Sequence, residues 1–177
     1  MVGMILTGRA LTAVLVNGVL PEKEQEMSGR TVNFLQGGLE VLEPDTHSIV
    51  LGRFLALDLG VKIGDGVVLL IPRPTGDGTL EPALERFIVR GVFEAGVQDH
   101  DSMLALVHLS EAARILSLGE RVGAIRFLTD DVMAAPAISG ALRESLGADF
   151  KSSDWTIENA SYFRAIRLEK MMMSLLL

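Results

Sequence analysis

The densest group of side chains that could do chemistry is Gln98-Asp99-His100-Asp101, which His108 follows along the chain. Carboxylates and imidazoles can ligate a metal ion or transfer protons. The spacing of His100 and His108 matches no standard ligand pattern, and the acidic run falls between two expected strands. The residues therefore favour a polar turn, and a metal-dependent enzyme is kept as an alternative.

Other sequence signatures of catalysis are missing from the chain. Gly64-Asp65-Gly66 and Gly76-Asp77-Gly78 are glycine-rich, but neither is followed by the Lys-Ser or Lys-Thr pair of a phosphate-binding loop. The chain has no cysteine, which excludes a thiolate nucleophile, a disulfide and a zinc–thiolate site. The sequence thus predicts a protein that is not an enzyme and needs no cofactor or metal.

The composition is that of an ordinary globular protein. The chain has 177 residues, of which 49% are hydrophobic and 22% charged, enough for one large domain or two small ones. The formal net charge is -7 and no run of lysine or arginine occurs. Because binding to phosphates depends on clustered basic residues, this charge argues against a nucleic-acid partner.

The first two thirds of the chain predict a mixture of strands and short helices. Met4–Val19 is rich in β-branched residues and reads as two strands around a turn, followed by a helix from Pro21 to Ser28. Ser48 is expected to cap a helix that carries Leu51, Leu55 and Leu59 on one face and ends at Gly60. The remaining expected elements are strands over Val67–Ile71, Phe87–Phe93 and Met103–Leu109, and a helix capped by Ser110.

Beyond a boundary near Gly119 the pattern predicts a βαβ unit. Its elements are a strand over Val122–Leu128, a helix over Asp131–Leu146 and a strand over Ala148–Lys151. Asp154 can cap a last helix, which runs into the apolar stretch Met171–Leu177. This stretch reads as the cut start of a membrane helix, with an apolar tail packed on its own domain as the alternative. The fold class expected for the whole chain is α+β.

The segment Pro72–Pro82 is the most unusual feature of the sequence. It contains three prolines and two glycines without an apolar period, and it is expected to be a protruding loop. Because prolines reduce the entropy lost on docking, such a loop suits recognition of a partner. Arg73 and Arg86 flank it and could pair with carboxylates at its base. The alternative is a tolerated surface insertion.

Three segments, in order, resemble one family of membrane proteins. Ile49–Asp65 resembles a stretch of the periplasmic domains of MacB/FtsX-type permeases. Gly91–Glu94 and Leu106–Arg114 resemble the strand–loop–strand–helix of the LolC/LolE branch. Asp154-Trp155 with Tyr162–Met172 is similar to the segment that leads into the second membrane helix of these permeases. The chain therefore resembles the periplasmic domain of a lipoprotein-releasing (Lol) ABC transporter permease.

The resemblance implies a MacB-like periplasmic domain with two parts. Residues 1–118 would form a mixed, β-rich Sabre-like part that carries the protruding loop 72–82. Residues 119–170 would form the C-terminal half of a βαβ Porter-like part, and residues 171–177 the truncated start of a transmembrane helix. The family's first membrane helix would then lie before the N-terminus of this chain.

The resemblance also implies a function at the periplasmic face of the Gram-negative inner membrane, to which flanking helices would connect the domain. With a second permease subunit or a second copy, and with the cytoplasmic ATPase LolD, it would release lipoproteins from that membrane. These lipoprotein substrates would pass to the periplasmic chaperone LolA, while ATP hydrolysis would stay in the separate ATPase subunit. The alternative is the same fold serving efflux or the regulation of a cell-wall hydrolase.

By position, the protruding loop matches the chaperone-recruiting Hook of the family, and its base matches the adjacent Pad. Glu85 stands where the recruiting subunit has a neutral amide, and Val68 where it has another arginine. These departures leave a lipoprotein-engaging sister subunit, or a hybrid of the two, open. The partner-binding residues implied by the resemblance are Arg73, Pro74, Thr75, Gly76, Asp77, Gly78, Thr79, Leu80, Glu81, Pro82 and Arg86.

Overall fold

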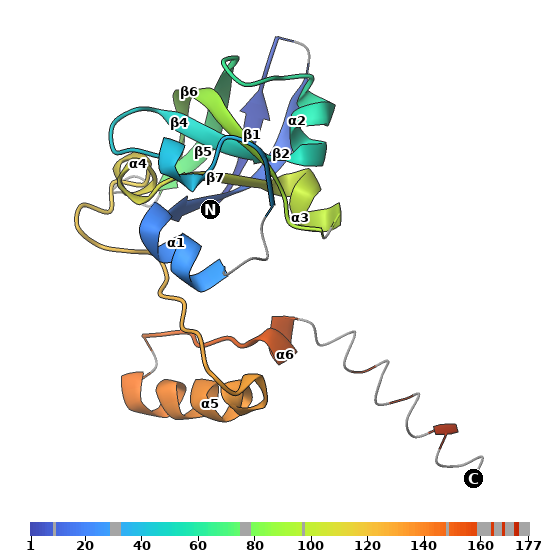
Figure 1. The fold of residues 1–177 in the computed structure, drawn as a ribbon. Coiled ribbons are helices and arrows are strands. Elements are labelled where there is room, and N and C mark those ends of the chain that lie inside the picture. Colours follow the sequence, from blue (N-terminus) through green and yellow to red (C-terminus); the bar gives the residue numbers. More distant parts are fainter. Residues whose placement is uncertain are drawn as a thin grey trace. The chain divides into compact units, whose positions relative to one another are not determined.

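A computed structural model describes residues 1–8, 10–28, 33–74, 79–96, 98–147, 149–158, 164, 168 and 172–173. The chain divides into two compact units, Met1–Ile125 and Arg126–Leu177, and each is described by itself. Helices and strands both occur, which confirms the α+β class (Figure 1). The division into Sabre-like and Porter-like parts stays a prediction.

The described part of the first unit contains seven strands and five short helical segments. The strands are β1 (Val2–Leu6), β2 (Leu11–Val19), β3 (Asn33–Gln36), β4 (Ser48–Gly52), β5 (Gly66–Pro74), β6 (Leu80–Glu94) and β7 (Leu104–His108). The helices are α1 (Pro21–Ser28), the 3-10 turn η1 (Leu39–Val41), α2 (Arg53–Leu59), α3 (Gln98–Met103) and α4 (Leu109–Ile115). The expected pair of strands before α1, and α1 itself, are confirmed.

Six of these strands close into a ring. Their order is β6-β4-β7-β2-β1-β5, and β5 pairs with β6 again, while β3 adds to the other side of β6 near Phe93. The pairs β2–β7 and β4–β6 are parallel and the others antiparallel. We refer to these six strands as the ring. Because each ring strand has two neighbours over part of its length, only parts of strands are left as free edges.

The interior of the ring is the main hydrophobic core. Alternate residues of each strand point inward, as the two-residue period of a strand requires. Helices α2 and α4 add Leu55, Leu59 and Ile115 to this core. A second cluster lies between β4, β6, β7 and η1, and its buried members are Val19, Leu39, Leu42, Val50, Phe93 and Leu106.

Two expected helix caps are wrong. Ser48 does not begin a helix, since Ser48–Gly52 is a strand whose residues are all buried between β6 and β7. The helix begins after Gly52, and the predicted end at Gly60 is confirmed by a left-handed φ of 64°. In the same way His108 rather than Ser110 caps α4, because the His108 side chain accepts a hydrogen bond from the Ser110 backbone N–H.

The predicted βαβ unit is also wrong within the described residues. The helix is present as α5 (Ala135–Leu146), preceded by the 3-10 turn η2 (Val132–Ala134) and ended at Gly147. Residues 122–128 and 149–151 form no strand, however, and residues 122, 125, 127 and 128 expose large apolar side chains. A strand needs a neighbour to complete its backbone hydrogen bonds, and the apolar alternation of residues 122–128 has none.

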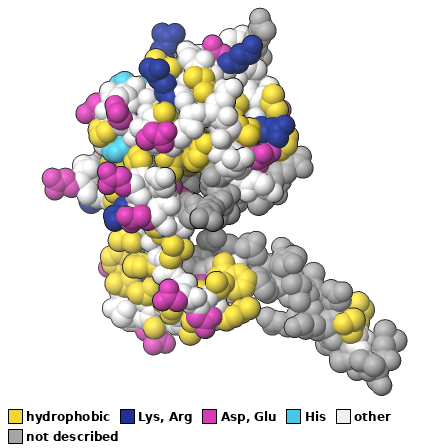
Figure 2. Space-filling model, in the orientation of Figure 1, with side chains coloured by type: hydrophobic (Ala, Val, Ile, Leu, Met, Phe, Trp, Pro, Cys, Tyr) yellow, Lys and Arg dark blue, Asp and Glu magenta, His cyan; other side chains and the backbone are white. Residues whose placement is uncertain are grey.

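The last helix with described bounds in the second unit is α6 (Trp155–Glu158), which Asp154 caps by accepting a hydrogen bond from the Thr156 N–H, as expected. Figure 2 shows many apolar side chains on the visible face of this unit. Among the residues that the structure describes, no helix combines the length and apolar content needed to cross a bilayer. The predicted start of a membrane helix at Met171–Leu177 lies almost entirely outside the described residues.

Candidate partner-binding site

The segment expected to be a loop is largely an extended hairpin. β5 and β6 pair without a break from Gly66↔Ile88 to Pro74↔Leu80, so Pro72–Pro74 and Leu80–Pro82 are strand residues. This corrects the expectation of a loop from Pro72 to Pro82. Thr75, Gly76, Asp77 and Gly78 of that expectation lie outside the described residues.

The end of the hairpin leaves the ring as a two-stranded ribbon. On β5 the ladder with β1 runs only to Met4↔Leu70, and on β6 the ladder with β4 begins only at Ile88. Beyond these points each strand has only the other as its neighbour. We refer to Ile71–Pro74 and Leu80–Ala83, which pair with each other, as the stem.

Three prolines explain how the stem keeps its ladder while leaving the ring. They lie on the pairs Pro72↔Pro82 and Pro74↔Leu80. Because proline has no N–H, these must be the non-hydrogen-bonded pairs, whose N–H positions point away from the ribbon. The cross-strand bonds of the stem therefore stay intact, while the outer edge of β5 loses its donors. The ladder with β1 ends before Pro72 for the same reason.

The two arginines that flank the segment do not share one base. Residues directly opposite in an antiparallel ladder lie on the same face, and faces alternate along each strand. Arg86 pairs with Val68 and is exposed on the outward face of the hairpin. Arg73 pairs with Glu81 and lies on the opposite face, together with Glu85. Both flank the segment as expected but lie on opposite faces of the hairpin, and their pairing with carboxylates of a partner stays a prediction.

An apolar groove follows the outward face of the stem, and the sequence pattern did not indicate it. The groove has a volume of about 370 Å³ and is open to solvent. β1 approaches β5 closely here, since a Cβ on Gly3 would lie 2.8 Å from the Leu70 carbonyl oxygen. Val2 and Leu80, which line it, are strongly exposed, and no pattern in the sequence indicates this exposure. Its lining residues are Val2, Gly3, Met4, Leu70, Pro72, Leu80, Glu81 and Pro82.

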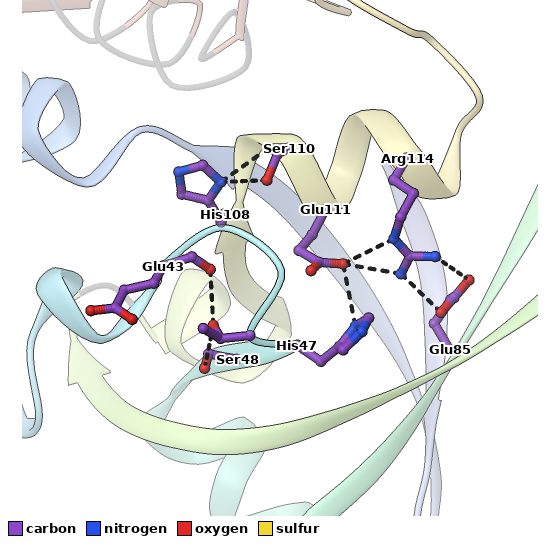
Figure 3. A network of polar contacts seen from close by, with 9 residues as sticks. Glu43, His47, Ser48, Glu85, His108, Ser110, Glu111 and Arg114 are labelled. Carbon is purple, nitrogen blue, oxygen red and sulfur yellow. Dashed lines mark hydrogen bonds and ion pairs between the residues drawn. The ribbon is translucent and has the colours of Figure 1, made fainter.

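A polar network reaches the hairpin on the face opposite the groove (Figure 3). Arg114 of α4 donates to both carboxylate oxygens of Glu85, from Nη1 at 3.1 Å and from Nη2 at 3.0 Å. The same guanidinium donates to Oε2 of Glu111, from Nη2 at 3.0 Å and from Nε at 3.3 Å. His47 brings its Nδ1 to 3.3 Å from this oxygen. One arginine thus bridges two carboxylates from different elements.

Glu111 is the buried member of this network. Its side chain is 1% exposed, and its Oε1 has no hydrogen-bond partner among the described residues. A buried carboxylate is stable only when it is paired, so Arg114 and His47 are the groups that make this position tolerable. Sequence reasoning missed the network, because its members come from β6, α4 and the loop before β4.

The ion pair also shifts the acid–base properties of its members. The hydrogen bonds from Arg114, and to a smaller extent the positive charges around it, including Arg73, hold the pKa of Glu85 below its usual value. The pKa of Arg114 is raised, chiefly by its hydrogen bonds to Glu85. The negative charge of Glu85 is therefore matched locally and is not a free acidic group at the base of the stem.

Two of the residues considered for metal binding, Asp101 and His108, have structural roles. Asp99, His100 and Asp101 belong to the short helix α3, which corrects the expectation of a turn. Asp101 is buried and accepts a hydrogen bond from the Ala95 N–H at 2.7 Å, while His108 caps α4. Within the described ranges, no three His, Asp or Glu side chains converge as metal ligands would.

Comparison with known proteins gives sequence relatives of one kind, while no protein-family model matches the chain. The chain is 32% identical to "Lipoprotein-releasing system transmembrane protein LolC" of Xylella fastidiosa (strain Temecula1), over 98% of this chain and 42% of that protein. LolC of Neisseria meningitidis serogroup B is 33% identical, over 94% of this chain and 41% of that protein. The corresponding LolE of Haemophilus influenzae is 26% identical over 96% of this chain.

The chain spans about two fifths of the length of the curated relatives it matches. Among solved structures, a permease-protein domain from Porphyromonas gingivalis is similar with a TM-score of 0.42 and 14% identity. That match covers 81% of this chain and 64% of that one, at a level below that from which a shared fold is inferred.

Proposed function

Since the chain belongs to the LolC/LolE family of lipoprotein-releasing transmembrane proteins, we propose that it is the periplasmic part of an ABC transporter permease subunit. In this proposal the full protein releases lipoproteins from the inner membrane and passes them to the periplasmic chaperone LolA. A second permease subunit or a second copy and the ATPase LolD complete the transporter. This chain supplies no ATP-hydrolysing site of its own.

The observation that carries the proposal is the similarity to LolC over nearly the whole chain. The named LolC relatives are 32% and 33% identical, whereas the LolE relative is 26% identical. This difference favours a LolC-like role over that of the sister subunit. It agrees with the earlier resemblance, which rested on three separate segments of the sequence.

The proposed docking site for LolA is the hairpin, from Arg73 to Pro82, with Arg86 at its base. Its support is physical: the stem leaves the ring, prolines stiffen it, and Leu80 exposes an apolar side chain next to the groove. Arg86 is exposed on the same face as the groove and can meet a carboxylate of a partner. Glu85, the acidic departure from the family pattern, is already paired with Arg114.

In the proposed mechanism the chain transmits motion rather than performing chemistry. Movement driven by ATP hydrolysis would enter through the segment from Asp154 to Leu177, which leads toward the membrane in the family. It would then displace the first unit and the docked chaperone relative to the membrane. Lipoprotein release and transfer would thereby be coupled to the cycle of the ATPase.

The experiment is ATP-dependent release of a radiolabelled lipoprotein from proteoliposomes that contain the full-length protein, its partner permease and LolD. We expect release into solution only when both ATP and LolA are present. Arg86→Ala should lower release several-fold, whereas Arg90→Ala, four positions along the same strand, should leave it unchanged. No release by the unmodified complex would contradict the proposal and favour an efflux or hydrolase-regulating relative.

A further inference from the structure

The polar network meets the hairpin at the level where the hairpin loses its other support. The β6 part of the stem ends at Ala83, and Glu85 follows two residues later. β6 gains a second neighbour only at Ile88. A two-stranded ribbon is of marginal stability on its own in water. The direction of the stem therefore depends on side-chain contacts made close to its base, where Ile71 is buried in the core and Glu85 is paired with Arg114.

Arg114 provides such a contact with fixed geometry. Its guanidinium is a rigid plane, and it donates to both oxygens of Glu85, which sets the orientation of that carboxylate as well as its distance. The adjoining edge of the same plane, through Nε and the shared Nη2, donates to Glu111. A single-contact ion pair on a flexible lysine would not fix the carboxylate in this way.

The other end of this contact cannot easily move. Glu111 is buried, and on the same helix Ala112 and Ile115 are part of the core of the ring. His47 approaches the same carboxylate oxygen from the loop before β4. Arg114 is thus held against the body of the ring on one side and holds the hairpin on the other.

Helix α4 lies close in sequence to the connection between the two units. α4 ends at Ile115, and the first unit ends ten residues later at Ile125, where the chain continues into the second unit. α4 is therefore the last described helix of the first unit before that connection. Because Arg114 lies in the last turn of α4, a displacement of this turn moves the group that holds Glu85.

We propose that Arg114 is a positioning residue that ties the direction of the β5–β6 stem to helix α4 through Glu85. It acts on the hairpin and makes no contact with a partner itself. The inference goes beyond the proposed function, because it concerns the hairpin whether or not LolA docks there. It also assigns a role to the acidic residue that departs from the family pattern.

The test is hydrogen–deuterium exchange of the 177-residue chain, followed at the amides that bond across the stem. These are the amides of Ile71, Arg73, Glu81 and Ala83, which lie on the pairs Ile71↔Ala83 and Arg73↔Glu81 next to the proline pairs. We expect Glu85→Gln to speed their exchange about fivefold, the effect of losing a well-formed, partly exposed ion pair.

The chain offers a matched control. Glu94 is also in β6 and is bonded to an arginine, since Arg53 Nη1 lies 2.6 Å from its Oε1, but it is at the other end of the strand. Glu94→Gln should leave exchange in the stem unchanged. Equal exchange in the Glu85→Gln and Glu94→Gln variants would overturn the proposal.

A second variant separates geometry from charge. Arg114→Lys keeps a positive charge beside Glu111 but lacks the fork that holds Glu85, so stem exchange should rise nearly as much as in Glu85→Gln. Combining the two should add little more, because both remove the same contact. Independent, additive effects would contradict the proposed link.

The proposal and the proposed function fail in different ways. If stem exchange responds to Glu85→Gln but LolA does not bind the chain, positioning stands and the chaperone assignment falls. If LolA binds the unmodified chain while stem exchange is insensitive to Glu85 and Arg114, docking stands and positioning falls.

Discussion

The hairpin β5–β6 runs from the ring into the stem, and its two parts differ in what holds them. Within the ring, Val67, Leu69 and Phe87 of the hairpin point into a closed interior and are buried. In the stem, Leu80, Glu81 and Pro82 of the same β6 are exposed. The ring is held by hydrophobic burial, whereas the stem beyond the buried Ile71 depends on one ladder, its prolines and the ion pair near its base.

This difference separates stability from recognition. Burial of large apolar side chains supplies most of the free energy of folding, so the ring can tolerate changes in the stem. In the stem, Leu80, Glu81 and Pro82 are exposed, so these side chains contribute little to folding. Substitutions in the two regions should therefore have opposite profiles, with effects on unfolding in the ring and on binding in the stem.

The largest effect is expected from a substitution inside the ring. Phe87→Ala removes a fully buried aromatic side chain that also meets His47 edge to face, and it should cost about 3–5 kcal/mol of the free energy of unfolding. Leu80→Ala, in the exposed part of the same strand, should change it by less than about 0.5 kcal/mol. Urea unfolding followed by circular dichroism measures both. Similar losses in the two variants would remove the distinction between ring and stem.

An intermediate effect is expected from Arg114 of α4, which contacts both the buried Glu111 and Glu85 near the base of the stem. Arg114→Ala leaves the Glu111 carboxylate buried with only His47 beside it, which should cost about 2 kcal/mol of the free energy of unfolding. Arg53→Ala removes the partner of Glu94, a carboxylate that is more exposed than Glu111. This substitution should cost less than about 1 kcal/mol of the free energy of unfolding. If thermal unfolding shows no difference between these variants, the burial of Glu111 does not carry the energy assigned to it.

The smallest effect on stability is a dependence on pH at Glu85. Its pKa is lowered from the ordinary value of 4.5 by Arg114, so its stabilising contribution is present above that value and is lost as the pH falls through the lower, folded-state pKa. Glu85→Gln should therefore cost about 1 kcal/mol near neutral pH and nothing in strong acid. Unfolding of both proteins across this range measures the difference. A difference that persists in strong acid would have another cause.

Much of the first unit could be predicted because its signals are local. The two strands around Thr7-Gly8, the helix that begins at Pro21 and the end of α2 at Gly60 follow from turn residues and proline alone. Ser48 misled the prediction because its neighbours can read as either a strand or a helix. Only burial on both sides, between β6 and β7, decides for the strand.

The rest of the account depends on contacts between distant segments, which no local pattern contains. The stem looks like a loop in sequence because its prolines suggest a break in a ladder, yet all three fall where no cross-strand bond is needed. The apolar stretch Val122–Leu128 looks like a strand but pairs with no strand among the described residues. Glu85 and Arg114 are brought together only by the closing of the ring.

The most direct test of the central claim is calorimetric titration of the 177-residue chain with LolA from the same organism. The matched variant has residues 75–81 replaced by glycine and serine, so that the ring and the pair Glu85–Arg114 are kept. We expect the unmodified chain to bind and the variant to lose binding while its thermal unfolding is unchanged. Equal binding by both would contradict docking at the hairpin, and no binding by the unmodified chain would contradict the assignment to LolA.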